Sequence, residues 1–173
     1  FSPSGISKAG HRAQLFGSGA ILNEVIKAQR ILEERYDVAA DVWSVTSYKA
    51  LNEDALNADR WNLLHPGETP RVPYITEVLR DEPGIFVATS DYVKTLPNSI
   101  ARWIPRPMHS LGTDGFGLSE SRACLRDHFE VDARYITLAV LTGLMREGEI
   151  DVSDVRKAVQ DLGISPEKKN PME

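Results

Sequence analysis

The chain has 173 residues, of which 42% are hydrophobic and 26% charged, so it predicts one packed domain and argues against disorder. A formal net charge of -5 without any basic run argues against a nucleic-acid partner, and no apolar run is long enough to span a membrane. The single cysteine, Cys124, excludes an internal disulfide framework and a multi-cysteine metal site, and its place in an expected helix predicts a buried or half-buried thiol.

The first residues differ in composition from the rest. Residues 1–12 are rich in Ser, Gly and polar groups and predict a linker or tail, which leaves residues 13–173 as the domain. The start at Phe1, in place of a methionine, suggests a fragment or a processed product, and a cytoplasmic location fits the composition as a whole.

A strand followed by a helix opens the domain. Ala13–Phe16 predicts a short strand that ends at the turn Gly17-Ser18-Gly19. Ile21, Val25, Ala28 and Leu32 then form one apolar stripe at helical spacing, and Ser18 is the expected N-cap.

The same alternation continues to the end of the chain. Strands are expected at Val38–Val45, Gly84–Thr89 and Met108–Leu111, with Trp43 and Phe86 in the core. Helices are expected at 47–62, after Pro73, and at 119–129, 132–147 and 151–162. A further helix is expected at 94–103 behind a cap at Asp91, but Pro97 means that it must start late or break there. Because strands and helices alternate, we expect a parallel sheet with helices on both faces, ordered Val38–Val45, Ala13–Phe16, Gly84–Thr89, Met108–Leu111.

The candidate chemical groups do not form a recognisable active site. The Gly17-Ser18-Gly19 turn resembles a phosphate-binding turn, but it lacks a third glycine and a P-loop lysine, so a tight strand-to-helix turn is the favoured interpretation. His109 ends an expected strand, yet it has no partner at ligand spacing, and Asp91 and Asp114 are single carboxylates. No G-x-S-x-G sequence is present, which argues against an esterase-like nucleophile.

Several long segments together carry a family resemblance. They are GSGAILNEV, DVWSVTSYKALNEDA, ADRWNLLHPGETPRVPYI, SDYVKTLPNSIARWIP and SLGTDGFGLSESRACLRDHFEVDARYI. From about Arg12 to the end, the chain resembles the C-terminal region of the homodimeric, thiamine-diphosphate-dependent pyruvate dehydrogenase first component. More distantly, FG-x-S at Phe116–Ser119 and SVTS at Ser44–Ser47 are similar to transketolase C-terminal domains.

This resemblance implies an α/β fold: a three-layer α/β/α sandwich with a mostly parallel sheet and an antiparallel first strand at one edge. That first strand is expected to be absent or to lie within residues 1–8. The family reaction decarboxylates pyruvate and transfers the acetyl group to a lipoyl group. In the full enzyme, thiamine diphosphate and magnesium are held by other domains, so the resemblance implies no catalytic, cofactor-binding or metal-binding residue in this chain.

The resemblance also implies partners. They are other domains of the same chain, the second subunit of a homodimer and, as an alternative function, the lipoyl acyltransferase core of the complex, for which the domain would be a docking module. From the residues themselves, the loop Gly112-Thr113-Asp114-Gly115-Phe116-Gly117 is the candidate contact site, because it follows the last expected strand at the carboxyl end of the sheet. Asp114 is expected to bond backbone N–H groups and hold the turn. Phe116 is expected either to pack on the helix 119–129 or to face a neighbouring domain or subunit.

Overall fold

A computed structural model describes residues 1–6 and 9–173. Strands and helices alternate along the chain as the sequence predicts. The elements are β1 (His11–Gly17), η1 (Gly19–Ile21), α1 (Leu22–Arg35), β2 (Val38–Ser44), α2 (Tyr48–Leu64), α3 (Tyr74–Leu79), β3 (Ile85–Thr89), α4 (Thr95–Asn98), η2 (Ala101–Trp103), β4 (Met108–Leu111), α5 (Arg122–His128), α6 (Ala133–Arg146) and α7 (Val152–Asp161).

The four strands form one sheet in the order β2-β1-β3-β4, and every neighbouring pair is parallel. This confirms the predicted order and direction. In the middle of the sheet, Ala13 pairs with Ala40 on one side and with Ile85 on the other. β1 begins at His11, so two residues of the segment expected as a tail belong to the sheet.

Part of the N-terminal segment lies along the free edge of β2. Ser2 and Val42 form a single antiparallel bridge, with N–H···O distances of 2.7 and 2.8 Å in the two directions. The Ser4 N–H donates to Asp41 at 2.7 Å, and the Ser4 hydroxyl donates to Glu33 at 2.6 Å. The edge where the family resemblance implies an antiparallel strand therefore carries one antiparallel bridge.

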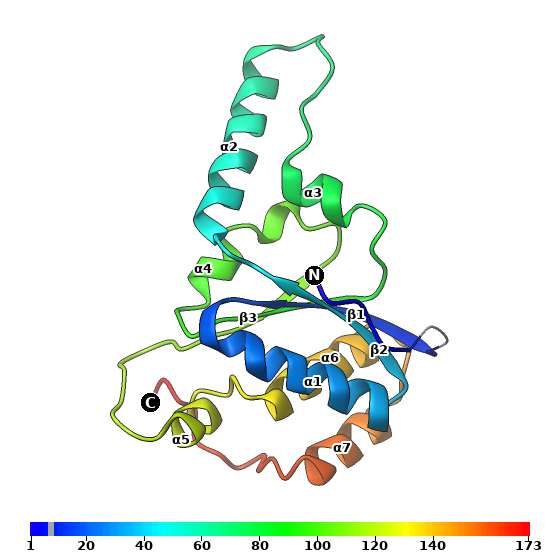
Figure 1. The fold of residues 1–173 in the computed structure, drawn as a ribbon, viewed down its shortest axis with the longest axis vertical. Helices are drawn as coiled ribbons and strands as arrows, with labels where there is room; N and C mark the ends of the chain where they lie inside the picture. Colours follow the sequence, from blue (N-terminus) through cyan, green and yellow to red (C-terminus); the bar gives the residue numbers. More distant parts are fainter. Residues whose placement is uncertain (7–8) are drawn as a thin grey trace.

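Helices cover both faces of the sheet, which confirms the three-layer α/β/α architecture. Figure 1 shows α1, α6 and α7 on one side and α2, α3 and α4 on the other. Because strand side chains alternate in direction, Ile85 and Val87 join the core beneath α1 and α6, whereas Phe86 and Ala88 join the core beneath α2 and α3. The predicted stripe of α1 is buried along its whole length, at Ile21, Val25, Ala28 and Leu32.

Two of the expected helix caps are wrong. Ser18 makes no side-chain cap bond, because the turn η1 intervenes and the N-cap of α1 is Ile21. Asp91 caps no helix either: the expected helix 94–103 is split into α4, whose N-cap is Lys94, and η2. Proline at position 97 fits the first turn of a helix, so α4 can start only just before it.

Two burial predictions are also corrected, whereas the burial of Phe86 is confirmed. Trp43 is only half-buried, because it lies near the carboxyl end of the edge strand β2, with its Nε1–H donating to Gln14 Oε1 at 2.7 Å and its ring 4.4 Å from that of Phe1. Cys124 is exposed, because α5 directs Leu125 toward the core around Ile21 and the following Phe129 is buried there.

Candidate functional site

The order of the strands creates a natural binding position at the carboxyl edge of the sheet. The chain leaves β1 through α1 on one face, and it leaves β3 through α4 on the other face. The two connections diverge between β1 and β3, which is where open α/β sheets bind their ligands. The hydroxyl groups of Ser18 and Ser90, which follow these two strands, lie 3.5 Å apart at this point.

A cavity of about 310 Å³ opens beside this position. Its walls are mostly apolar, and its polar groups are a carboxylate, a hydroxyl and two guanidinium groups. The lining residues are Ala20, Asp91, Thr113, Gly117, Leu118, Arg122, Leu125, Arg126, Phe129 and Val131. Two members of the predicted loop, Thr113 and Gly117, therefore lie in the cavity wall, but the arginines of α5 were not expected from the sequence.

The candidate loop is tied to the loop after β3 by polar contacts. The Thr113 N–H donates to the Tyr92 carbonyl at 2.9 Å, and the Lys94 N–H donates to Asp114 Oδ1 at 2.8 Å. Asp114 thus binds a backbone N–H as expected, but in the neighbouring loop instead of its own turn. A Cβ on Gly112 would lie 2.6 Å from the Tyr92 carbonyl oxygen, so only glycine allows this close approach.

The large side chains of these loops point into solvent. Phe116 is 93% exposed, and it does not pack on α5 in this chain. Tyr92 and Val93 from the loop after β3, and Leu118 beside Phe116, are also exposed. We call these four residues the carboxyl-edge patch. Exposed aromatic and aliphatic side chains that gather on adjacent loops are typical of a contact surface.

A charged network supports the helix behind the cavity. Glu24 of α1 is buried and accepts from Lys27 at 2.8 Å, from Arg126 at 2.9 Å and from the Ala133 N–H at 3.3 Å. Burial by itself raises the pKa of this carboxyl, but the bonds from Lys27 and Ala133 and the charges of Lys27 and Arg126 hold the pKa below its ordinary value of 4.5. The network therefore fixes α5, and with it one wall of the cavity, against α1 and α6.

The remaining predicted groups do not assemble into a catalytic constellation. His109 is exposed on β4, and partial desolvation together with the charges of Arg146 and Lys94 lowers its pKa. At the Gly17-Ser18-Gly19 turn, a Cβ on Gly17 would lie 2.9 Å from Val25, which supports tight strand-to-helix packing as the reason for the glycine. Across residues 1–6 and 9–173, His, Cys, Asp and Glu side chains form no group of three that could hold a metal ion.

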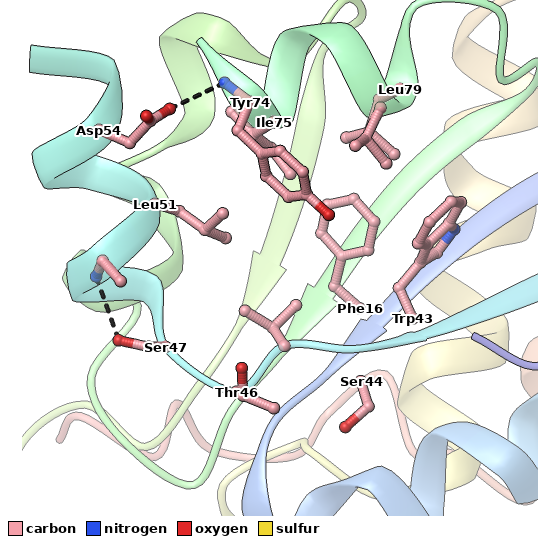
Figure 2. Close-up of a pocket in the computed structure, with 13 residues that line it drawn as sticks. Phe16, Trp43, Ser44, Thr46, Ser47, Leu51, Asp54, Tyr74, Ile75 and Leu79 are labelled. Atoms are coloured by element: carbon pink, nitrogen blue, oxygen red, sulfur yellow. Dashed lines mark hydrogen bonds between the residues drawn. The ribbon is translucent and has the colours of Figure 1, made fainter.

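A second, larger cavity of about 480 Å³ lies between α2 and α3, on the other face of the sheet. Figure 2 shows its apolar side chains, Phe16, Trp43, Leu51, Ile75 and Leu79, with the ring of Tyr74 drawn among them. Two of the polar groups that line it are used locally: Ser47 caps α2 by accepting from the Ala50 N–H, and Asp54 accepts from the Tyr74 N–H at 2.8 Å. In the part of the chain that the structure describes, none of the helices is long and apolar enough to cross a membrane.

The comparison with known proteins identifies the family. The family profile "Transketolase-like TK C-terminal domain" matches residues 5–132. The chain belongs to this family. It is similar to the pyruvate dehydrogenase E1 component of Pseudomonas aeruginosa, with 44% identity over 96% of this chain and 19% of the relative. It is also similar to those of Escherichia coli K12, at 47% over 92% of this chain and 18% of the relative, and Haemophilus influenzae, at 48% over 94% and 18%.

These matches confirm the predicted resemblance and also set its extent. The chain spans about a fifth of the length of the curated relatives that it matches. The part of the relatives that it matches is a domain of an enzyme, and the family profile agrees with the observed α/β fold.

Proposed function

We propose that this chain is the C-terminal domain of a thiamine-diphosphate-dependent pyruvate dehydrogenase E1 component, in which it supports the assembly of the dimer and does not carry the chemistry. The observation that carries the proposal is the identity of 44–48% to named E1 components over more than nine-tenths of the chain. The full enzyme would decarboxylate pyruvate in the cytoplasm and pass the acetyl group to a lipoyl group. Thiamine diphosphate, with magnesium, would supply the electron sink for that reaction from a site outside this domain.

The carboxyl-edge patch supports the assembly role. Phe116, Leu118, Tyr92 and Val93 expose apolar surface on loops that backbone and carboxylate bonds already hold in place. Preorganised loops lose little conformational entropy when a partner covers them, so their apolar side chains can contribute most of their burial energy to the contact. The candidate contact residues remain Gly112, Asp114, Gly115, Phe116 and Gly117, with the second subunit or another domain of the same chain as the partner.

The test is Phe116→Ala in the full-length enzyme, with Val152→Ala as a matched control at an exposed apolar position on α7, on the other side of the molecule from the patch. Sedimentation would measure the dimer, and pyruvate decarboxylation would measure turnover per assembled dimer. We expect weaker dimerisation, normal turnover in the dimer that forms, and no change for the control. Lost turnover in a fully assembled, cofactor-loaded dimer would show that the loop takes part in the chemistry, and lost binding of the lipoyl acyltransferase alone would favour the docking role.

A further inference from the structure

One part of the domain extends beyond both of its cores. Figure 1 shows α2 rising away from the sheet to a loop that returns to α3. The last buried residue of α2 is Ala58, and the returning chain is next buried at Pro73. We call residues 59–72 the arm. Its exposed apolar side chains are Leu63, Leu64 and Val72, which are 79%, 54% and 45% exposed.

The arm is held in one conformation although it has no core of its own. Asn62 and Arg71 exchange two hydrogen bonds, with the Arg71 N–H donating at 2.7 Å and the Asn62 amide donating to the Arg71 carbonyl at 2.9 Å. The Arg71 guanidinium lies 4.3 Å from the centre of the Trp61 ring, and Trp61 stacks on His65 at 4.4 Å. The polar and aromatic groups thus face one another, and the leucines are left on the outside.

The base of the arm is anchored to the domain as well. Asp59 accepts from the Trp103 indole N–H at 3.1 Å and forms an ion pair with Arg102. An arm that is rigid before any partner arrives binds at a low entropic cost. Exposed leucines on such an arm lower the solubility of the free domain, so they are expected to have a partner in the protein in which the domain works.

The position of Phe1 indicates which partner this is. The Phe1 ring packs at 4.4 Å on Trp43, and Trp43 lines the cavity between α2 and α3 at the base of the arm. In a longer enzyme of which this chain is the C-terminal domain, as proposed above, the polypeptide that precedes Phe1 arrives on the same face of the sheet as the arm, whereas the C-terminus lies on the opposite side (Figure 1). The relatives are about five times as long as this chain, so about four-fifths of such a polypeptide is available to cover the arm.

We infer that Leu63, Leu64 and Val72 dock into an apolar groove on the preceding part of the same polypeptide. The inference rests on the proposed function in requiring that this chain is the C-terminal domain of a longer enzyme. The arm surface differs from the carboxyl-edge patch: it uses α2 and the loop before α3, whereas the patch uses the loops after β3 and β4. The domain then has two separate contact surfaces, and the arm serves the contact within the chain.

The experiment places a photoreactive residue in the full-length enzyme, as Leu63→p-benzoylphenylalanine, with Val152→p-benzoylphenylalanine as the matched control. Val152 is 52% exposed on α7, on the other face of the sheet. Dimers mixed from light and isotopically heavy subunits distinguish cross-links within a chain from cross-links between chains. We expect position 63 to cross-link within its own chain, to peptides that precede this domain, and position 152 to remain at background.

Oxidative footprinting of the unmodified enzyme gives a second measurement that needs no substitution. If the arm is docked, we expect Leu63 to be oxidised much more slowly than Val152, after correction for intrinsic reactivity. Cross-links only between subunits, cross-links only to the acyltransferase, or rapid oxidation of Leu63 would each overturn the inference. Pyruvate decarboxylation by the same preparation tests the proposed function separately, because an active enzyme with a solvent-exposed arm would overturn this inference alone.

Discussion

The middle of the sheet and the loops at its carboxyl edge place their large apolar side chains in opposite environments. In β3, Phe86 and Val87 point to opposite faces, and both are completely buried. In the loop that follows β4, the chain instead exposes Phe116 and Leu118. The edge loops are held by specific bonds, such as the one from the Lys94 N–H to Asp114, and not by apolar burial. The stability of the domain therefore depends on other residues than the contacts proposed for it, and mutations can test the two independently.

The largest effect is expected from Phe86→Ala. Phe86 is fully buried beneath α2 and α3, where its ring lies 5.9 Å from that of Phe16 in an edge-to-face arrangement. Truncation leaves a cavity in a packed core, so we expect the free energy of unfolding to fall by about 3–5 kcal/mol. Urea denaturation monitored by circular dichroism measures this. A loss below about 1 kcal/mol would mean that the core beneath α2 and α3 relaxes to fill the space.

The second largest loss of stability is expected at Gly84, which lies directly before β3 at the amino end of the strand. Gly84 has a φ of +92°, and a Cβ there would lie 2.0 Å from the Arg12 carbonyl oxygen of the neighbouring strand. Gly84→Ala combines left-handed strain with a displaced strand, so we expect a loss of about 2–4 kcal/mol. Gly117→Ala is the matched control in the edge loops, because no atom lies within 4 Å of its added Cβ. Equal losses of unfolding free energy for Gly84→Ala and Gly117→Ala would show that the sheet and the carboxyl-edge loops tolerate substitution equally.

The Glu24 network joins α1 to α5 and α6, and its contribution to the free energy of unfolding should depend on pH. Glu24→Gln keeps the shape but weakens the bonds to Lys27 and Arg126, so we expect a loss of about 1–3 kcal/mol near pH 7. Because folding lowers the pKa of Glu24, its contribution is present above the unfolded pKa and is lost as the pH falls through the folded pKa. The difference between wild type and variant should therefore shrink below about pH 4.5, as denaturation at several pH values would show. A constant difference would assign the effect to packing and not to charge.

The sequence predicts the positions of the strands because short, mostly apolar runs such as Val38–Val45 and Gly84–Thr89 alternate with stretches of helical periodicity. It misjudges positions where the environment depends on distant elements. Trp43 has the pattern of a core residue, yet β2 is the edge strand and the described residues form a single β-bridge, at Ser2, along its free edge, so the ring stays half-buried. The contact of Arg126 with Glu24 joins residues 102 positions apart, and no local spacing indicates it. The position of the loop 112–117 is predictable because it follows from the topology of the sheet. The presence of Arg122 and Arg126 in the wall of the cavity is not predictable from the sequence.

The smallest effect on stability is expected at the carboxyl-edge patch. Phe116 is 93% exposed and buries almost no area in this chain, so Phe116→Ala removes little hydrophobic stabilisation. The loop conformation depends instead on Gly112, on the Thr113 N–H and on Asp114, and the substitution changes none of these. We therefore expect the free energy of unfolding of the isolated chain to change by less than about 0.5 kcal/mol, as is usual for surface substitutions. Asp114→Ala is the informative comparison, because it removes the acceptor of the Lys94 N–H and should cost about 1 kcal/mol. If Phe116→Ala costs as much as Asp114→Ala in the isolated chain, the ring packs within the domain and the patch is part of its structure, not a surface for a partner.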